Sequence, residues 1–210
     1  MIKKLRFLIA SGPTREPLDP VRYLSNYSTG TMGRCLVQAV KRKGHKVTSV
    51  ECPSDAETAL ELQSRLKKFL PKHDVLIMAS AVCDVRPLHL SGTKIKKDRL
   101  SSIKLTKNPD ILAGLSKIKR ADQIFIGFGL ESENIFKNGF KKLHSKKLEL
   151  IVIQQVKNNK TPFGEKPIEA FVLEKKRVLK KFKSVTKEKL AGFLVEEAGR
   201  LFSKHAGKSA

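Results

Sequence analysis

The residues with the clearest chemical potential begin in a long polar segment that spans residues 10–33. Glycines in such a segment permit close approach of the backbone to a ligand, and hydroxyl groups before a helix lie where backbone N–H groups attract anions. The segment contains Gly12, Gly30 and Gly33 together with Ser28, Thr29 and Thr31. It predicts a phosphate-binding loop. A purely structural loop stays an alternative, because the spacing matches neither the dinucleotide-binding nor the P-loop fingerprint.

Four further positions carry side chains suited to a nucleotide. Lys142 and Lys146 lie four residues apart in a predicted helix, so both can reach one anion. Their spacing alone nevertheless favours ordinary exposed lysines. Asp84 follows a predicted strand, where a carboxylate can accept hydrogen bonds from a ribose or a base amino group. Phe128 fits either an aromatic wall for the nucleotide or a core position.

Alternating strands and helices would position these residues. Short apolar runs predict strands, and apolar residues at helical spacing predict helices. The predicted strands cover residues 5–10, 46–50, 74–79, 123–129, 148–153, 169–173 and 177–182, and the predicted helices cover about 32–43, 56–70, 133–146 and 186–203. The alternation predicts one domain over residues 1–210 with a three-layer α/β/α, Rossmann-like fold. Its sheet is expected to be mainly parallel, with ligands at the carboxyl ends of the strands.

One more helix is expected at Asn108-Pro109-Asp110, because proline suits a first helical turn and the preceding asparagine can cap it. The intervening residues 10–31 are predicted to form a polar loop, and residues 80–106 an irregular stretch.

The composition limits the function classes. The 43 Lys and Arg residues exceed the 20 Asp and Glu residues, for a net charge of +23, which favours anionic partners, although most of these side chains are expected to form a solvated surface. No apolar run approaches the roughly 18 residues of a membrane-spanning helix, and the N-terminal run is too short for a secretory signal. We therefore expect a cytoplasmic protein. Three scattered cysteines predict reduced, packed thiols, and five histidines without ligand spacing predict no metal site built by the protein.

The chain resembles phosphopantothenoylcysteine synthetases, the ligases of coenzyme A biosynthesis, in six segments that follow the order and spacing of that family. They are SGPTREPLDPVRYLSNYSTGTMG (11–33), AVCDVRP (81–87), KIKK (94–97), KNPDIL (107–112), IGFGLESE (126–133) and KKLELIVI (146–153). The resemblance extends to about residue 173. It corresponds to the stand-alone synthetase, without the flavin-dependent decarboxylase domain that precedes it in many bacteria.

The resemblance implies a ligase that condenses 4′-phosphopantothenate with L-cysteine through an acyl-nucleotidyl intermediate and releases pyrophosphate and a nucleoside monophosphate. The wording of the first segment and of KIKK favours CTP over ATP, with Mg²⁺ carried on the triphosphate. A homodimer is also implied, and we expect the C-terminal strands to be used in dimerisation. Neither a membrane nor nucleic acid is expected as a partner.

The resemblance assigns roles to individual residues of this chain. The nucleotide would contact Gly12, Ser80, Asp84, Lys94, Pro109, Asp110, Ile111, Leu112, Phe128, Lys142 and Lys146. The catalytic residues would be Arg22, Asn26 and Lys94, and the acyl substrate would contact Arg22, Asn26, Ser28 and Gly30. An amide and a guanidinium can orient and stabilise an oxyanion, whereas neither is a strong base at neutral pH.

The chain departs from the family pattern at several places. Thr31 replaces a lysine, Val85 an aromatic residue, and Gly129-Leu130 an alanine pair. Gln154-Gln155 replaces an Asn-Asp pair, which removes one carboxylate and keeps a degenerate synthetase as an alternative. Two other classes fit less well: a dinucleotide-dependent oxidoreductase would need a glycine fingerprint, and a nucleic-acid-binding protein is suggested by charge alone.

Overall fold

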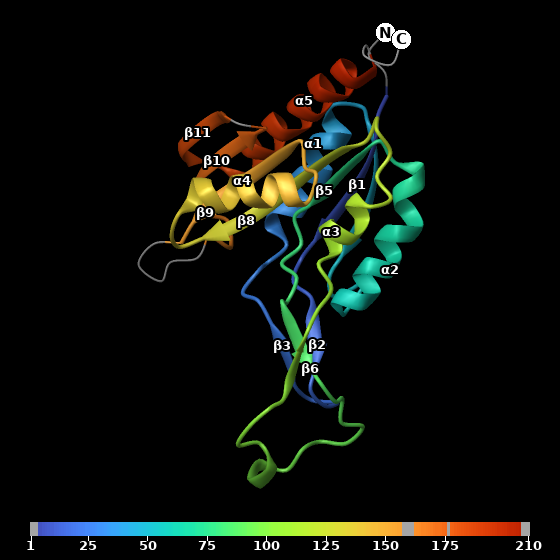
Figure 1. Ribbon diagram of the computed structural model, residues 1–210, viewed down its shortest axis with the longest axis vertical. Helices are drawn as coiled ribbons and strands as arrows, with labels where there is room; N and C mark the ends of the chain where they lie inside the picture. The colour runs from blue at the N-terminus through green and yellow to red at the C-terminus, as the bar shows by residue number, and fades with distance from the viewer. Residues whose placement is uncertain (1–3, 157–161, 176, 207–210) are drawn as a thin grey trace.

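The computed structural model describes residues 4–156, 162–175 and 177–206. Its centre is a seven-stranded sheet with the order β11-β10-β9-β8-β5-β1-β4 (Figure 1). Neighbouring strands from β4 to β9 are parallel, and β10 and β11 add an antiparallel edge. The strands are β1 (Arg6–Ser11), β4 (Lys46–Glu51), β5 (Val75–Met78), β8 (Ile124–Glu131), β9 (Leu150–Gln155), β10 (Ile168–Glu174) and β11 (Arg177–Val185). The predicted mainly parallel sheet is confirmed.

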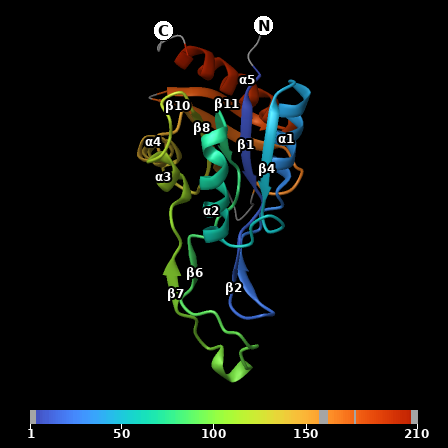
Figure 2. The same cartoon turned by 90° about the vertical axis from the view of Figure 1, so that its right-hand side faces the viewer.

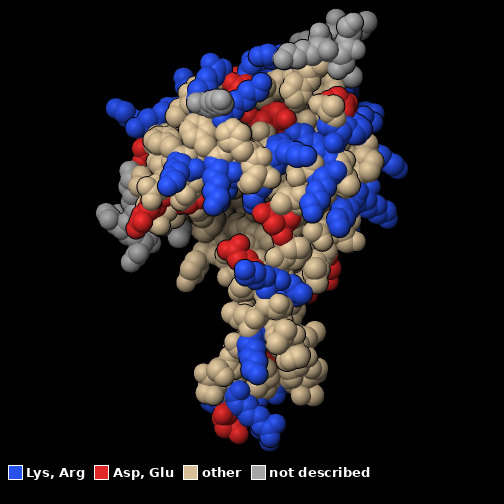
Figure 3. Space-filling model, viewed as in Figure 1, with Lys and Arg blue, Asp and Glu red and all other residues tan. Residues whose placement is uncertain are grey.

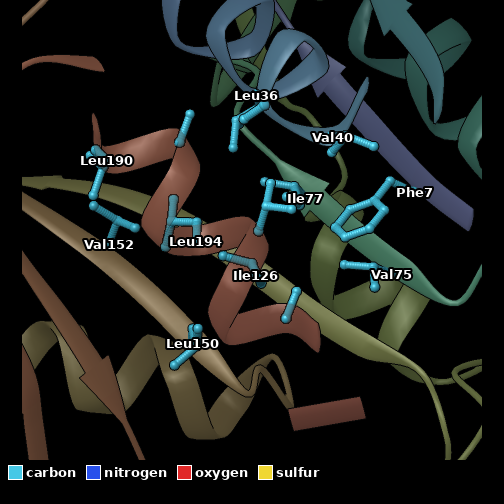
Figure 4. Packing of buried hydrophobic residues seen from close by; sticks show 14 of the residues in the cluster. Phe7, Leu36, Val40, Val75, Ile77, Ile126, Leu150, Val152, Leu190 and Leu194 are labelled. Atoms are coloured by element: carbon cyan, nitrogen blue, oxygen red, sulfur yellow. The ribbon is translucent and has the colours of Figure 1, made fainter. Parts of the chain in front are cut away.

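Helices cover both faces of this sheet, as a three-layer fold requires (Figures 1 and 2). They are α1 (Thr31–Arg42), α2 (Ala59–Phe69), α3 (Ile111–Ser116), α4 (Ile135–Ser145) and α5 (Lys187–Ala206), with short 3-10 helices at η1 (Leu70–Lys72) and η2 (Lys97–Arg99). On one face, Leu36 of α1 and Leu194 of α5 belong to the buried cluster around Phe7 and Ile77 (Figure 4). On the other, α2, α3 and α4 pack in a second cluster around Leu76.

The central strands are buried on both faces, which explains why they read as continuous apolar runs rather than as alternating ones. In β1, Phe7 and Ile9 belong to the α1–α5 cluster, whereas Leu8 and Ala10 belong to the α2–α4 cluster. Successive side chains of a strand point to opposite faces, so one short segment anchors both helical layers.

A projecting arm, residues 13–25 and 85–107, extends beyond the carboxyl ends of the parallel strands (Figures 1 and 2). Two antiparallel hairpins form it. The hairpin strands are β2 (Arg15–Pro17) with β3 (Tyr23–Ser25), and β6 (Val85–Pro87) with β7 (Leu105–Lys107). The expectation of a polar loop and an irregular stretch is therefore wrong at these four strands. Each has three residues, which is too few for a periodic pattern to show.

Asp19 ties the two halves of the arm together. Its buried carboxylate accepts hydrogen bonds from the backbone N–H groups of Val21 (2.9 Å), Arg22 (2.9 Å) and Ile95 (3.1 Å). The Arg22 guanidinium pairs with Asp19 and also donates to the Ile95 carbonyl (2.7 Å). The bond with Arg22 is the main cause that holds the pKa of Asp19 below its ordinary value. Because Ile95 follows Lys94, this brace also positions the first lysine of KIKK.

The start of α3 differs from its prediction. Asp110, rather than Asn108, caps the helix by accepting a hydrogen bond from the Ala113 N–H (3.0 Å), so Pro109 lies before the helix instead of in its first turn. The Asn108 side chain is occupied elsewhere: its amide donates to the Cys83 carbonyl (2.9 Å). A capping carboxylate of this kind satisfies an N–H that the helix itself leaves free.

We expect Asp19→Asn to loosen the arm, because a neutral amide loses the ion pair with Arg22 and keeps one acceptor oxygen instead of two. Hydrogen exchange at the Ile95 amide should become faster by roughly tenfold or more, while exchange in β1 and β5 stays unchanged. Asp98→Asn is the matched control, since Asp98 is an exposed aspartate on the same arm. Wild-type exchange at Ile95 in Asp19→Asn would show that this carboxylate does not hold the arm.

Candidate functional site

A cavity of 430 Å³ lies at the carboxyl ends of the parallel strands, beside the base of the arm. Its walls come from segments far apart in the sequence. They are residues 28–32 at the start of α1, 78–84 after β5, 108–112 at the start of α3 and 128–130 in β8, with further contributions from α4, β9 and α5. This is the edge at which a parallel α/β sheet offers a binding crevice, and the volume suits a small molecule.

The cavity collects most of the residues predicted for the site. Those that line it are Asn26, Ser28, Gly30, Ser80, Asp84, Pro109, Asp110, Ile111, Leu112, Phe128, Lys142 and Lys146. Gly12, Arg22 and Lys94 do not line it. The structure thus brings together residues that the sequence separates by more than a hundred positions, and their individual roles stay predictions.

The start of α1 forms one wall and is open to an anion. Gly30 precedes the helix with φ 71°, a left-handed conformation that favours glycine, and no described side chain caps the first turn. The hydroxyl groups of Thr29 and Thr31 contact each other at 2.9 Å. Uncapped N–H groups at the start of a helix of this length carry partial positive charge, so the wall attracts a phosphate or carboxylate.

Gly12 supports the cavity from behind. Its φ is 76°, and a Cβ atom there would lie 2.0 Å from the Cys52 carbonyl oxygen, so only glycine fits. The Ser80 hydroxyl donates to the Gly12 carbonyl (2.7 Å), and the Ala81 N–H donates to the same oxygen (2.9 Å). These bonds join the loop after β1 to the loop after β5, both of which lead into the arm.

Lys142 and Lys146, which line the cavity at the end of α4, each form an ion pair with a carboxylate. Lys146 Nζ lies 3.1 Å from an Asp110 oxygen, and Lys142 pairs with Glu131 at the end of β8. The Asn138 side chain donates to the other Glu131 oxygen (2.9 Å), which fixes that carboxylate further. Lys142 lies in the last turn of α4, whereas Lys146 is the residue just after the helix, and each ammonium is compensated by a different acid. Their binding of one common anion stays a prediction.

Asn26 is attached to the loop after β5. Its side-chain amide donates to the Ala81 carbonyl (2.9 Å) and lies 3.6 Å from the Cys83 sulfur. Asp84 follows on the same loop with an exposed side chain at the cavity, and its carbonyl accepts from the Asn108 N–H (2.8 Å). The predicted oxyanion-binding amide and the predicted nucleotide-binding carboxylate therefore lie on adjoining parts of one wall.

The predicted catalytic residues Arg22 and Lys94 lie on the arm instead. Arg22 is engaged by Asp19 and by the Ile95 carbonyl, and Lys94 is exposed. Within one chain, neither side chain belongs to the cavity wall.

Two further residues of the cavity wall, Phe128 and Gln154, were named in the sequence analysis. Phe128 is half-buried and packs against the α1–α5 cluster while also lining the cavity, so both of its suggested placements hold in part. Gln154 is buried and lines the cavity, so the departure from the family pattern puts a neutral amide at this strand end.

The cysteines are free and buried, as predicted. Burial raises the pKa of the Cys83 thiol at the cavity and raises that of Cys52 to about 11. Both thiols are therefore protonated at neutral pH, a state that does not suit a nucleophile.

Sequence reasoning missed several residues at or beside the cavity wall. Glu131 pairs with Lys142 and stands inside the quoted segment IGFGLESE without having been singled out, although it does not itself line the cavity. Lys187 and the segment 162–164 carried no motif, and their place at the cavity follows from tertiary structure alone.

Positive side chains outnumber negative ones in this chain, 43 to 20. Figure 3 shows Lys and Arg spread over the body and the arm on one face, with Asp and Glu between them. Within the described ranges, no three His, Cys, Asp or Glu side chains are grouped to hold a metal ion. The described helices include none long and apolar enough to cross a membrane.

Comparisons with known proteins place this chain in a family. The coenzyme A biosynthesis bifunctional protein CoaBC of Borreliella burgdorferi is 35% identical over 191 residues, which cover 84% of this chain and 48% of that protein. Its Escherichia coli counterpart is 36% identical over 170 residues, covering 74% of this chain and 42% of that protein. The chain thus spans about half the length of these curated relatives.

Solved structures agree. A crystal structure of the C-terminal domain of a CoaBC protein superposes with a TM-score of 0.78 at 25% identity, covering 97% of this chain and 98% of the other. A Cab2 mutant in complex with phosphopantothenate-cysteine superposes with a TM-score of 0.68 at 16% identity, and the match covers 98% of this chain and 88% of the Cab2 chain. At this identity the likeness supports the fold alone.

A family model described as the DNA/pantothenate metabolism flavoprotein C-terminal domain matches residues 2–201. This match confirms the resemblance to phosphopantothenoylcysteine synthetases at the level of the family. The chain belongs to the DNA/pantothenate metabolism flavoprotein C-terminal domain family, which is the family of the synthetase part of CoaBC.

Proposed function

We propose that this chain condenses 4′-phosphopantothenate with L-cysteine to 4′-phosphopantothenoylcysteine, using CTP and passing through an acyl-cytidylate. The observation that carries the proposal is the cavity, which joins an uncapped helix start, hydroxyl groups and lysines at the carboxyl edge of the sheet. A site of this kind suits two anionic substrates. A cytoplasmic location is part of the proposal, as is a homodimer.

The first step brings two anions together, because a carboxylate attacks the α-phosphate of the nucleotide. Lys142 and Lys146 would reduce this repulsion and stabilise charge on the phosphates as pyrophosphate leaves. Both lysines must exchange their carboxylate partners, Glu131 and Asp110, for phosphate oxygens. The start of α3 and Phe128 would border the nucleotide, and Asp84 would accept hydrogen bonds from its ribose or base.

Mg²⁺ bound with the triphosphate would neutralise part of its charge. The described acids that line the cavity are Asp84 and Asp110, and either carboxylate could add a ligand to a metal already held by the phosphates. The metal is therefore proposed to enter with the nucleotide.

The second step needs an acyl group held for attack by the cysteine amine. The Asn26 amide would turn from the Ala81 carbonyl toward the acyl oxygen, where an N–H donor stabilises developing negative charge. Ser28 and Gly30, beside the start of α1, would hold the acyl substrate. The buried, protonated Cys83 thiol takes no part as a nucleophile.

A homodimer would supply the residues that lie off the cavity. The arm carries Arg22 and Lys94 and exposes many apolar side chains. These are Val21, Tyr23, Leu88, Leu90, Ile103 and Leu105. Contact of the arm with a second copy would cover them. The edge strand β11 suits the expected C-terminal contact less well, because lysines on an edge strand oppose pairing with another sheet.

The assay that tests the proposal supplies 4′-phosphopantothenate, cysteine and Mg²⁺ with either CTP or ATP. We expect cysteine-dependent product with release of CMP, and slower or absent turnover with ATP. AMP release with product would assign ATP to the same ligase. Folded protein that forms no product with either nucleotide would overturn the proposed ligase activity and favour a degenerate family member. In that case, steeply salt-dependent binding of unrelated DNA would indicate a nucleic-acid-binding protein.

Asn26→Asp should separate the two steps. Pyrophosphate release from CTP is expected to continue, while formation of the ligated product falls by roughly a hundredfold, because an acidic oxygen replaces the donor for the acyl oxyanion. Product and pyrophosphate are measured in the same reaction. Asn134→Asp is the matched control, since Asn134 is exposed before α4, its side chain does not cap the helix, and it lies outside the cavity wall. Normal product yield from Asn26→Asp would contradict the role of this amide.

A further inference from the structure

Lys187 is a buried lysine at the cavity that none of the predicted roles uses. It is the first residue of α5 and only 5% exposed, and it lines the same cavity as Lys142 and Lys146. A lysine is almost never buried to this extent unless its charge has a partner.

The partners of Lys187 are backbone carbonyls. Its Nζ donates to the carbonyls of Pro162 (3.0 Å) and Lys166 (3.5 Å), and Pro162 also lines the cavity. Among the ion pairs of the described residues, none includes Lys187, whereas Lys142 and Lys146 each have a carboxylate. Burial is the main cause that lowers the pKa of the Lys187 ammonium, and the charge of the neighbouring Glu188 carboxylate opposes this shift only in part.

Lys187 also stands on the opposite side of the sheet from the other two lysines. Lys142 lies in α4 and Lys146 directly follows it, and α4 packs in the α2–α4 cluster, whereas α5 packs with α1. The start of α5 is next to α1, because the Cys35 thiol of α1 contacts the Glu188 carboxylate at 3.5 Å. The uncapped start of α1 and Lys187 therefore belong to the same layer and line the same cavity.

We propose that Lys187 is a substrate-binding residue that holds a phosphoryl group at the α1 side of the cavity. This inference rests on the proposed ligase function. The phosphoryl group belongs either to the nucleotide or to 4′-phosphopantothenate, which present the same chemistry to a lysine. By also holding the Pro162 carbonyl, Lys187 fastens the segment 162–164 as a wall of the cavity.

Lys187 suits an incoming phosphoryl group because its partners differ from those of the other two lysines, which each pair with a carboxylate. A phosphate that reaches Lys142 or Lys146 must displace a carboxylate, so part of the attraction offsets a lost ion pair. At Lys187 an arriving anion displaces no described carboxylate. The interaction also forms in a buried setting, where charges are screened less than at the surface.

The test compares Lys187→Gln and Lys187→Arg with Lys189→Gln as the matched control. Lys189 is exposed two residues along the same helix, so its loss changes the net charge equally without touching the cavity. Calorimetric titrations with CTP, with ATP and with 4′-phosphopantothenate are run separately. These titrations measure binding without turnover, and comparison of the three ligands identifies which substrate carries the phosphoryl group that Lys187 binds.

We expect Lys187→Gln to lower the affinity for one of these ligands by roughly tenfold to a hundredfold, because a charge-assisted contact is lost. Lys187→Arg should stay within about threefold of wild type, since it keeps the charge. The salt dependence of binding should become shallower in Lys187→Gln and stay unchanged in Lys189→Gln. If Lys187 served only to hold Pro162, the salt dependence of ligand binding would not change, because salt screens the attraction between a charged residue and the ligand rather than a bond to a carbonyl.

Equal affinities of Lys187→Gln and wild type for all three ligands would overturn the inference, as would an equal loss in Lys187→Arg and Lys187→Gln with unchanged salt dependence. If wild type binds none of the ligands, the proposed ligase fails and the inference with it.

A further measurement on wild type covers the case in which Lys187→Gln does not fold. The Nζ resonance of Lys187 is assigned in ¹⁵N-lysine-labelled protein by its loss in Lys187→Arg. It should shift on addition of the ligand that binds there. An unchanged resonance at saturating CTP, ATP and 4′-phosphopantothenate would overturn the inference.

Discussion

The parallel alignment of β4, β1, β5, β8 and β9 is the constraint on which the rest of this structure depends. Parallel strands all end at the same edge, so the loops that follow β1, β5, β8 and β9 must converge there. The hydrophobic side chains of both faces hold this alignment, with Phe7 and Leu8 buried against opposite helical layers. The cavity is a consequence of that packing, because polar residues can gather only where the apolar strands stop.

Charge is balanced differently on the two sides of this edge. On the α4 side, Lys142 and Lys146 lie against Glu131 and Asp110, which keeps the wall close to neutral until a stronger anion arrives. On the α5 side, the backbone carbonyls that accept from Lys187 satisfy its hydrogen bonds without cancelling its charge. Together with the uncapped start of α1, this side offers the less compensated positive potential. A site with both kinds of wall can hold two anionic substrates without placing all of its cations at one point.

The arm separates part of the candidate machinery from the cavity. The buried Asp19 carboxylate accepts hydrogen bonds from the backbone of Arg22 and of Ile95, and the Arg22 side chain donates to the Ile95 carbonyl. These bonds hold the first hairpin and the KIKK segment together as one unit. That unit exposes apolar side chains and carries Lys94 away from the body. This organisation agrees with the proposed dimer, in which a second copy would give the arm a surface to pack on and a cavity to reach.

The sequence by itself determined the alternation of strands and helices, the mainly parallel sheet and a set of candidate site residues, most of which line the cavity. Short continuous apolar runs such as VLIM in β5 are typical of strands buried on both faces, and several of the quoted motifs stand directly after such runs. The closeness of Lys142 and Lys146 along the chain was also predictable, because a spacing of four residues corresponds to one helical turn, and the Lys146 N–H still donates to the Lys142 carbonyl at the end of α4.

Only the tertiary structure decided the remainder. The hairpins of the arm depend on pairing between short segments, such as β6 and β7, whose local sequences carry no strand period. The cap of α3 fell to Asp110 because Asn108 is held by the Cys83 carbonyl. Lys187 reached the cavity because α5 packs beside α1 after more than a hundred intervening residues. Burial and ion pairing arise between elements, so the neighbours of a lysine in space, rather than its neighbours in sequence, determine whether its charge is free to bind a substrate.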